Sequence, residues 1–376
     1  MKKITIVGLP GDVHSLEVYR ALQSYERNNS KLLIEYIYPL DIGHHDTWSL
    51  DVTNKSGVLV SSRKIASLEQ QPTLESHVVW FRRFAKNVTF EQYDDISVRA
   101  NIEMETTYHI VGCLAARFKN ALQINPIDSQ SAGLKHLQLS LASEVGLKIP
   151  DTLISNDPMA IREFQKKHKD IIFKPLTGVQ WKTDTGETRF TQTNRIECLN
   201  EFDDDDFIFG AGIYQPFIDK QKEVRVFVAG HTFLAMVSVP SEPSEETDWR
   251  KLTGAKIISK PIEVPADIKE KCLSLLSKEG LHFAMFDFLI YDEDWIFLEA
   301  NPGGQFLFME LQCPEIYVLD AFTKFLLSGN PKFEYQGPDS NSFKYDVENE
   351  AKEPEGHHYE QFYGYDYRRV SLAGLT

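Results

Sequence analysis

Hydrophobic runs and helical periods alternate along the first third of the chain. Short apolar runs predict strands over residues 3–9, 32–38 and 78–84, and apolar residues at helical intervals predict a helix over about 91–118. Residues 40–76 are polar and are expected to be irregular. Because strands that alternate with helices favour a parallel sheet, we predict an α/β domain over residues 1–125.

The middle of the chain, residues 126–213, combines helical periods with short apolar runs. Asp157 and Pro158 are typical of a helix start, as cap and first-turn residue. The acidic run 203–206 is expected to be a solvated loop. The other predicted elements are a helix over about 129–146, strands at 153–154 and 170–176, and a polar hairpin over 177–195.

The last part of the chain changes character near residue 330. Residues 208–300 are rich in predicted strands, with a helix over 266–279, and a helix over about 315–328 closes the core. We therefore predict a third unit over residues 214–330. Residues 331–376 lack periodicity and are expected to form a tail that is draped on the surface or disordered.

Composition and charge narrow the class of protein. A chain of 376 residues suggests two or three domains. A formal net charge of −15 argues against nucleic acid as a partner, and no apolar run approaches the roughly 20 residues of a membrane helix. The start resembles a signal peptide only superficially, because its apolar stretch is too short. The four cysteines are far apart, which favours reduced thiols in a cytoplasmic protein.

Two apolar runs flanking an acidic turn over residues 286–301 predict a β-hairpin with polar chemistry on one face. With the turn centred on Glu293, Asp287 lies opposite Glu299, and Asn301 points to the same face. Two carboxylates and an amide oxygen suit Mg²⁺. The alternative is an edge hairpin with both acids in solvent, since a register slip of one residue would break the pairing.

These residues resemble the ATP-grasp superfamily, in which paired strands near the end of the catalytic core supply an acid and then an E-x-N metal motif. Asp287 and the segment Glu299-Ala300-Asn301-Pro302-Gly303-Gly304 match that pattern. The resemblance implies an ATP-grasp fold, with α+β catalytic lobes and an N-terminal pre-ATP-grasp α/β domain. It also implies ATP and Mg²⁺ as cofactors, with Asp287, Glu299 and Asn301 as metal ligands.

The same resemblance assigns nucleotide contacts. Lys135 matches the early nucleotide-binding lysine, Lys174 matches the second lysine, on a strand beside the phosphates, and Glu223 matches a ribose-binding acid. The hinge that reads adenine corresponds to Gln215, Pro216, Phe217 and Ile218. Arg225 and Arg250 are the expected catalytic arginines, which would neutralise the transferred phosphate; a structural ion pair is the alternative for Arg225. The phosphate-covering loop departs from the pattern, because residues 177–186 hold only two glycines.

Within the superfamily, the chain resembles over about residues 1–330 the ribosomal-peptide maturases that make microviridin-like graspetides. Trp80-Phe81-Arg82-Arg83, the E-V-R-V segment and Asp248-Trp249-Arg250 carry this closer resemblance. It implies that Asp or Glu side chains of a precursor peptide are phosphorylated and joined to Ser, Thr or Lys. A leader segment would dock the peptide, and a homodimer is expected because homodimers are common in that group. Arg82 and Arg83 would face the substrate carboxylate or form ion pairs.

Three alternatives stay open. A ligase of the same superfamily could act on a free amino acid or a protein terminus, as glutathione synthase and glutamate ligases do. A catalytically silent binding module would not need Asp287, Glu299 and Asn301 together. The tail carries Ser371, Asp366 and other groups suitable for a fused substrate.

Overall fold

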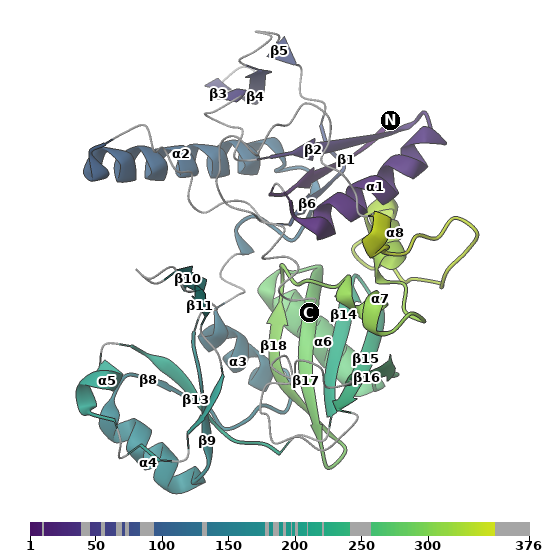
Figure 1. The fold of residues 1–376 in the computed structure, drawn as a ribbon. Helices are drawn as coiled ribbons and strands as arrows, with labels where there is room; N and C mark the ends of the chain where they lie inside the picture. Colours follow the sequence, from purple (N-terminus) through teal and green to yellow (C-terminus); the bar gives the residue numbers. More distant parts are fainter. Residues whose placement is uncertain are drawn as a thin grey trace.

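The computed structural model of the chain places its elements in three groups around separate sheets (Figure 1). No helix in the part of the chain that it describes is long and apolar enough to cross a membrane. The structure describes residues 1–9, 11–38, 46–53, 57–64, 70–71, 75–82, 94–129, 134–176, 180–182, 188–190, 193–196, 198–199, 202–208, 210–219, 222–240 and 257–349.

The first sheet is parallel, as the alternating pattern predicts. Its strands run in the order β2-β1-β6-β7. Their bounds are Lys2–Val7 (β1), Leu32–Ile37 (β2), Val78–Phe81 (β6) and Leu122–Ile124 (β7). Since side chains alternate across a strand, Val78 and Trp80 join the core on the side of α1 (Val13–Arg27), whereas Val79 and Phe81 pack with α2 (Ile96–Arg117).

Residues 46–71 contain strands that the prediction of an irregular region misses. An antiparallel sheet pairs β3 (Asp46–Thr53) with β4 (Gly57–Lys64), and β4 with β5 (Gln70–Gln71). In β3 the apolar residues Trp48, Leu50 and Val52 alternate with polar ones, which is a strand signal. Of these three, Leu50 and Val52 are exposed. The signal is therefore present in the sequence, but most of β3 contributes little to a core.

The second sheet is antiparallel, in the order β12-β9-β13-β8. Its elements are β8 (Leu153–Ser155), α4 (Pro158–His168), β9 (Ile171–Lys174), β12 (Asn194–Ile196) and β13 (Gly212–Pro216), with the hairpin β10 (Gln180–Lys182) and β11 (Thr188–Phe190) beside them. The Asp157 side chain caps α4 as predicted. The acidic run is not a loop, because Asp204 starts α5 (Asp204–Ile208), where carboxylates complement the helix dipole.

The third sheet is a five-stranded antiparallel sheet with β18 at one edge. Its order is β16-β15-β14-β17-β18, with β14 (Lys222–Ala229), β15 (Thr232–Pro240), β16 (Ile257–Pro261), β17 (Phe283–Tyr291) and β18 (Asp294–Asn301). One face packs against α6 (Ala266–Glu279) and α3 (Lys135–Glu144). Helix α3 is shorter than the helix predicted over 129–146. It runs beside β18 (Figure 1).

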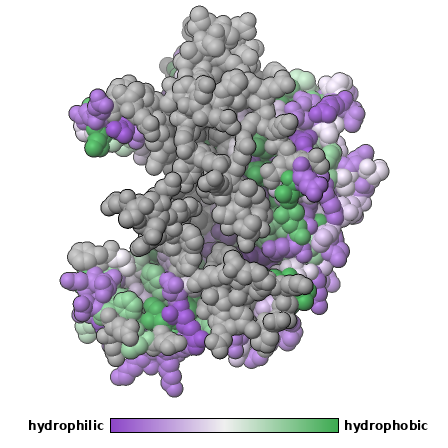
Figure 2. Space-filling view, in the orientation of Figure 1, coloured by the Kyte–Doolittle hydropathy of each residue, from purple (hydrophilic) through white to green (hydrophobic). Residues whose placement is uncertain are grey.

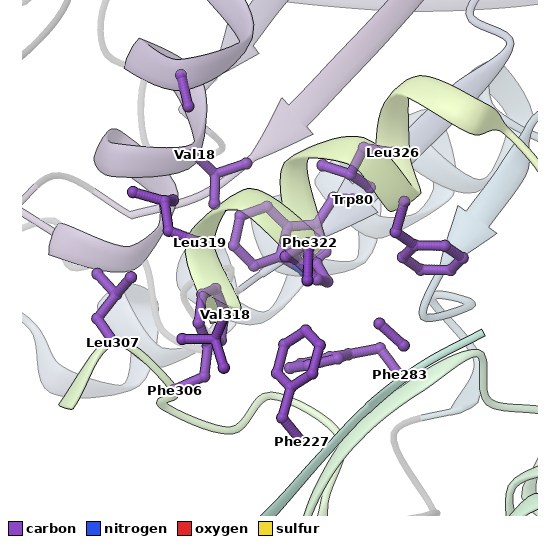
Figure 3. Packing of buried hydrophobic residues seen from close by; sticks show 14 of the residues in the cluster. Val18, Trp80, Phe227, Phe283, Phe306, Leu307, Val318, Leu319, Phe322 and Leu326 are labelled. Carbon is purple, nitrogen blue, oxygen red and sulfur yellow. The ribbon is translucent and has the colours of Figure 1, made fainter. Parts of the chain in front are cut away.

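The helix α8 (Val318–Ser328), which follows α7 (Phe308–Gln312), joins the first and third sheets. Phe322 of α8 packs against Trp80 of β6 and Phe283 of β17 (Figure 3). Phe227 and Phe306 complete this aromatic cluster. The core is therefore continuous between the N-terminal sheet and the sheet that carries the hairpin 286–301.

Residues 331–349, which we call the C-terminal strap, pack against this core and end in η4 (Val347–Asn349). Tyr345 is buried, and its N–H donates to Glu310. Asp320 accepts hydrogen bonds from Tyr335 and Ser342. Most residues of the strap are exposed, as expected of a tail draped on the surface, but it is anchored by the buried Tyr345. Elsewhere on the face shown in Figure 2, hydrophilic residues predominate among those described.

Candidate active site

The hairpin of β17 and β18 reaches the predicted pairing through a different turn. Asp292 and Glu293 form a two-residue turn with φ of 49° and 66°, and Tyr291 pairs with Asp294. The turn is therefore not centred on Glu293, and Asp294 is a strand residue. A register shift between Asp287 and Phe288 then restores the pairing of Asp287 with Glu299.

Four strand residues and a helix residue meet on one face of the sheet. Arg225 of β14 pairs in register with Asp287, and its Nη1 lies 2.7 Å from Asp287 Oδ2. Lys135 Nζ of α3 lies 3.2 Å from Glu299 Oε2, and Asn301 Nδ2 donates to Glu299 Oε1 over 3.2 Å. The structure thus brings together two predicted cations with the three predicted metal ligands.

Buried and half-buried residues alternate along the first part of β14. Val224, Val226 and Val228 are fully buried on the face covered by α6, whereas Glu223 and Arg225 are half-buried on the other. Arg225 Nη2 lies 3.7 Å from Glu223 Oε2. Arg225 therefore links Glu223, the predicted ribose-binding acid, to Asp287. The sequence analysis gave such an ion pair as the alternative to a catalytic role for Arg225.

Glu299 is held in its ionised form. Burial alone would raise its pKa, but the Lys135 ammonium, the hydrogen bonds from Asn301 and Lys135, and the Arg225 guanidinium lower the pKa of Glu299 to about 2. Its side chain is 30% exposed and that of Asp287 is 14% exposed, so both remain within reach of a small ligand. Two carboxylates that face each other across one strand pair form an attractive position for a cation.

The donor chemistry fits Mg²⁺. Among the described residues no group of three or more His, Cys, Asp or Glu side chains gathers into a metal site. The cluster instead offers the carboxylates of Asp287 and Glu299 and the amide oxygen of Asn301. Magnesium is usually bound by one or two carboxylates of the protein, while phosphate oxygens and water complete the octahedron. The set of Asp287, Glu299 and Asn301 matches the ligands that a protein usually supplies.

Three other predicted nucleotide residues, Lys174, Gln215 and Pro216, lie on the second sheet. Lys174 of β9 pairs with Ile213 of β13. Gln215 and Pro216, further along β13, also pair with residues of β9. Gln215 is buried and donates to Thr152 Oγ1 over 2.9 Å.

From β13 the chain continues through a connection to β14. The Phe217 N–H donates to Asp170 O, and the Arg195 guanidinium lies 4.1 Å from the centre of the Phe217 ring. Ile218 is half-buried and follows Phe217 toward β14. The predicted hinge therefore connects the two sheets. Arg250 lies outside the described residues, as do Arg83 and most of 177–186.

The loop after the Glu-Ala-Asn segment is held by the N-terminal unit. Asn125 Nδ2 donates to Pro302 O over 2.9 Å, and Arg82 Nη1 donates to Gly303 O. Arg82 also forms an ion pair with Asp12, at 3.4 Å, so of its two predicted roles the structure shows the ion pair. At Gly304 a Cβ atom would lie 2.5 Å from Met285 Cγ, which requires glycine there.

One contact that the sequence analysis missed is that of Gln138. Its side chain is buried on α3 and bonds both backbone groups of Ala300, between Glu299 and Asn301. The sequence did hold a signal for this contact. Gln138 is a polar residue next to the core residues Leu139 and Ala142 of α3, and a buried amide needs hydrogen-bond partners.

Comparison with known proteins identifies the fold. Residues 141–292 match the model of the prokaryotic glutathione synthetase ATP-grasp domain, and the chain has the ATP-grasp fold. A search of curated proteins finds no significant match.

Among solved structures, the chain is similar over its length to ATP-grasp ligases associated with ribosomally synthesised, modified peptides. A ligase of Chryseobacterium gregarium, in complex with ADP and a leader and core peptide, is 23% identical with a TM-score of 0.75; the match covers 88% of this chain and 98% of that one. The macrocyclase MdnC of Microcystis aeruginosa MRC, bound with precursor peptide MdnA, is 22% identical with a TM-score of 0.71; the match covers 87% and 99%.

Proposed function

We propose that the protein is an ADP-forming ligase that closes macrocycles in a ribosomal precursor peptide. The observation that carries this proposal is the cluster of Asp287, Glu299 and Asn301 with Arg225 and Lys135 on one sheet face. It stands in a chain whose fold is similar, over nearly its whole length, to peptide-modifying ATP-grasp ligases.

ATP would bind between the second and third sheets. The hinge residues Gln215, Pro216, Phe217 and Ile218 would contact adenine, and Glu223 the ribose. Lys135 and Lys174 would bind phosphate oxygens. Arg225 and Arg250 would offset the negative charge that spreads over the transferred phosphate. Because Arg225 already contacts Asp287, nucleotide binding would add a phosphate to an existing ion pair.

Asp287, Glu299 and Asn301 would hold Mg²⁺. When bound, the ion neutralises phosphate charge and orients the terminal phosphate. The contribution of the chain is to keep the Glu299 carboxylate ionised and to place it opposite Asp287. The pKa of Glu299, lowered to about 2, means that this carboxylate requires no deprotonation near neutral pH.

The chemistry proposed has two steps. A carboxylate oxygen of a peptide Asp or Glu attacks the terminal phosphorus of ATP, and the bond to ADP breaks. A Ser or Thr hydroxyl or a Lys amine then attacks the acyl carbon, loses its proton, and expels phosphate. The product is a side-chain ester or amide, and the peptide becomes lighter by one water for each ring.

Peptide recognition would be separated from chemistry. An acid-rich peptide is repelled by a protein of net charge −15, so affinity would come from a leader segment that docks away from the reacting residues. Tight binding of a leaderless core peptide, equal to that of the full precursor, would contradict this part of the proposal.

A second candidate is a ligase for free amino acids, and one observation favours it. The family model that matches residues 141–292 describes a glutathione synthetase domain. The candidate site itself is compatible with either acceptor, because both reactions pass through an acyl phosphate.

The test is ADP release from MgATP by the purified protein, with and without the precursor peptide encoded nearest its gene. We expect peptide-stimulated release, peptide products lighter by multiples of one water, and loss of both in Glu299→Ala. Release that ignores the peptide but responds to free amino acids would support the second candidate. Nucleotide binding without turnover under any condition would indicate a silent module. Mass loss confined to residues 350–376 of the protein itself would indicate a fused substrate.

A further inference from the structure

The buried amide of Gln138 makes two hydrogen bonds to a single residue. Its Oε1 accepts the Ala300 N–H over 2.8 Å, and its Nε2 donates to Ala300 O over 2.8 Å. A side-chain amide that binds both groups of one residue reproduces the pairing that a neighbouring strand would provide. Gln138 is only 3% exposed, so these bonds are shielded from water.

This pairing occurs on an edge strand. β18 has β17 on one side, and its outer N–H and C=O groups would be open unless something covers them. Near the middle of β18, Lys148 O accepts the Phe297 N–H over 2.7 Å. At Ala300 the cover is the Gln138 side chain. The outer edge of β18 is thus anchored close to Glu299 and Asn301.

The anchor is placed where it controls the candidate ligands. Glu299 and Asn301 flank Ala300, so a tilt of the backbone at Ala300 would carry both side chains away from Asp287. Lys135 lies three positions before Gln138 on the same helix and reaches Glu299 Oε2. One helix therefore contacts the backbone at Ala300 and the carboxylate next to it.

We infer that Gln138 is a positioning residue that aligns Glu299 and Asn301 for the cation. This inference rests on the proposed metal site. Gln138 touches neither the nucleotide nor the peptide in this assignment; it acts through the backbone of Ala300. Residues that orient metal ligands from behind commonly change metal affinity by about 10- to 100-fold when they are replaced.

The test compares four proteins: wild type, Gln138→Leu, Leu139→Ala and Gln138→Glu. Gln138→Leu removes both bonds to Ala300 at similar volume. Leu139→Ala is the matched control, because Leu139 is the next residue of α3, is buried, and packs into the core without bonding Ala300. Both variants are expected to lower the melting temperature. A third variant, Gln138→Glu, keeps an acceptor for the Ala300 N–H but places carboxylate oxygen against Ala300 O.

The primary measurement is binding of Mn²⁺, as a spectroscopic substitute for Mg²⁺, in the presence of ADP. We expect Mn²⁺ affinity to fall about tenfold or more in Gln138→Leu and Gln138→Glu, and to remain unchanged in Leu139→Ala. The Mg²⁺ concentration that gives half-maximal ADP release should rise in the same variants.

Unchanged Mn²⁺ affinity in folded Gln138→Leu, or an equal loss in Leu139→Ala, would overturn the inference. Wild-type protein that binds Mn²⁺ with ADP but never turns over peptide would refute the proposed function, while the comparison of variants still decides the role of Gln138. Wild-type protein that binds no Mn²⁺ would overturn both.

Discussion

Two pairs of neighbouring carboxylates in this protein are stabilised in different ways. At the candidate active site, Asp287 and Glu299 each face a cation, and their side chains are 14% and 30% exposed. Under the C-terminal strap, Glu310 and Asp320 are 5% and 0% exposed. Glu310 accepts two backbone N–H groups, whereas Asp320 combines hydroxyl donors with an ion pair to Lys324 at 2.9 Å.

The pKa values follow from this difference. Cations outweigh burial at Glu299 and lower its pKa to about 2. At Glu310 burial outweighs the backbone N–H groups and Lys344, and raises the pKa to about 7. A carboxylate compensated by cationic side chains at a partly exposed site is suited to exchange one partner for another. A carboxylate enclosed by backbone donors is suited to hold a segment in place.

The largest expected contrast is in activity. Glu299→Gln should reduce peptide-stimulated ADP release by about 10²- to 10³-fold, because it removes a charge from the cation position. Glu310→Gln makes the same chemical change at a site away from the nucleotide and should retain most activity near pH 7. Initial rates at saturating MgATP measure both. Equal losses in the two variants would mean that Glu310 also supports catalysis.

The next contrast is in stability. Asp320→Ala should lower the free energy of unfolding by about 3 kcal/mol, because it removes the fully buried acceptor that Tyr335, Ser342 and Lys324 share, although Lys324 keeps its ion pair with Asp339. Asp287→Ala removes a partly exposed ion pair and should cost about 1 kcal/mol or less. Urea unfolding gives both values. A loss at Asp287 as large as that at Asp320 would contradict the distinction.

A further expected effect is a pH dependence of stability from Glu310. Its carboxyl loses a proton near 4.5 when unfolded and near 7 when folded, so the folded state holds more protons between these values. Its contribution to stability is therefore lost as pH rises through this window, by about 1 to 3 kcal/mol. Glu310→Gln should lack this fall. Urea titrations at several pH values test it, with Glu348→Gln, an exposed acid of the strap, as control; a wild-type slope in Glu310→Gln would refute the assignment.

The hairpin shows how far the sequence predicts the site. Alternation of apolar and polar residues placed Asp287, Glu299 and Asn301 on one face. The turn was predicted to be centred on Glu293, but it is centred between Asp292 and Glu293. The bulge between Asp287 and Phe288 then restores the predicted register. A bulge depends on how the strands pack, and short-range pattern does not reveal it. The predicted pairing was therefore correct although one of its assumptions was not.

The support of the site was less predictable. Gln138, Asn125 and Arg82 reach the backbone of Ala300, Pro302 and Gly303 across long sequence separations. Such contacts between side chain and backbone leave no periodic signal. The anchors of the strap were not predicted for a related reason, since its polar composition suggested solvent, while its partners are the buried acids of α7 and α8.

The packing of α8 on α1 has a consequence for how the chain folds. Val18 of α1 and Leu319 of α8 belong to one core, Lys2 Nζ donates to Leu327 O, and Tyr25 reaches Asn341 O. Helix α1 thus gains its apolar cover from a helix that follows much later in the chain. During translation this face of α1 stays uncovered until α8 has left the ribosome. Closure of so long a loop is a slow step, and the nascent chain should depend on chaperones until α8 has packed.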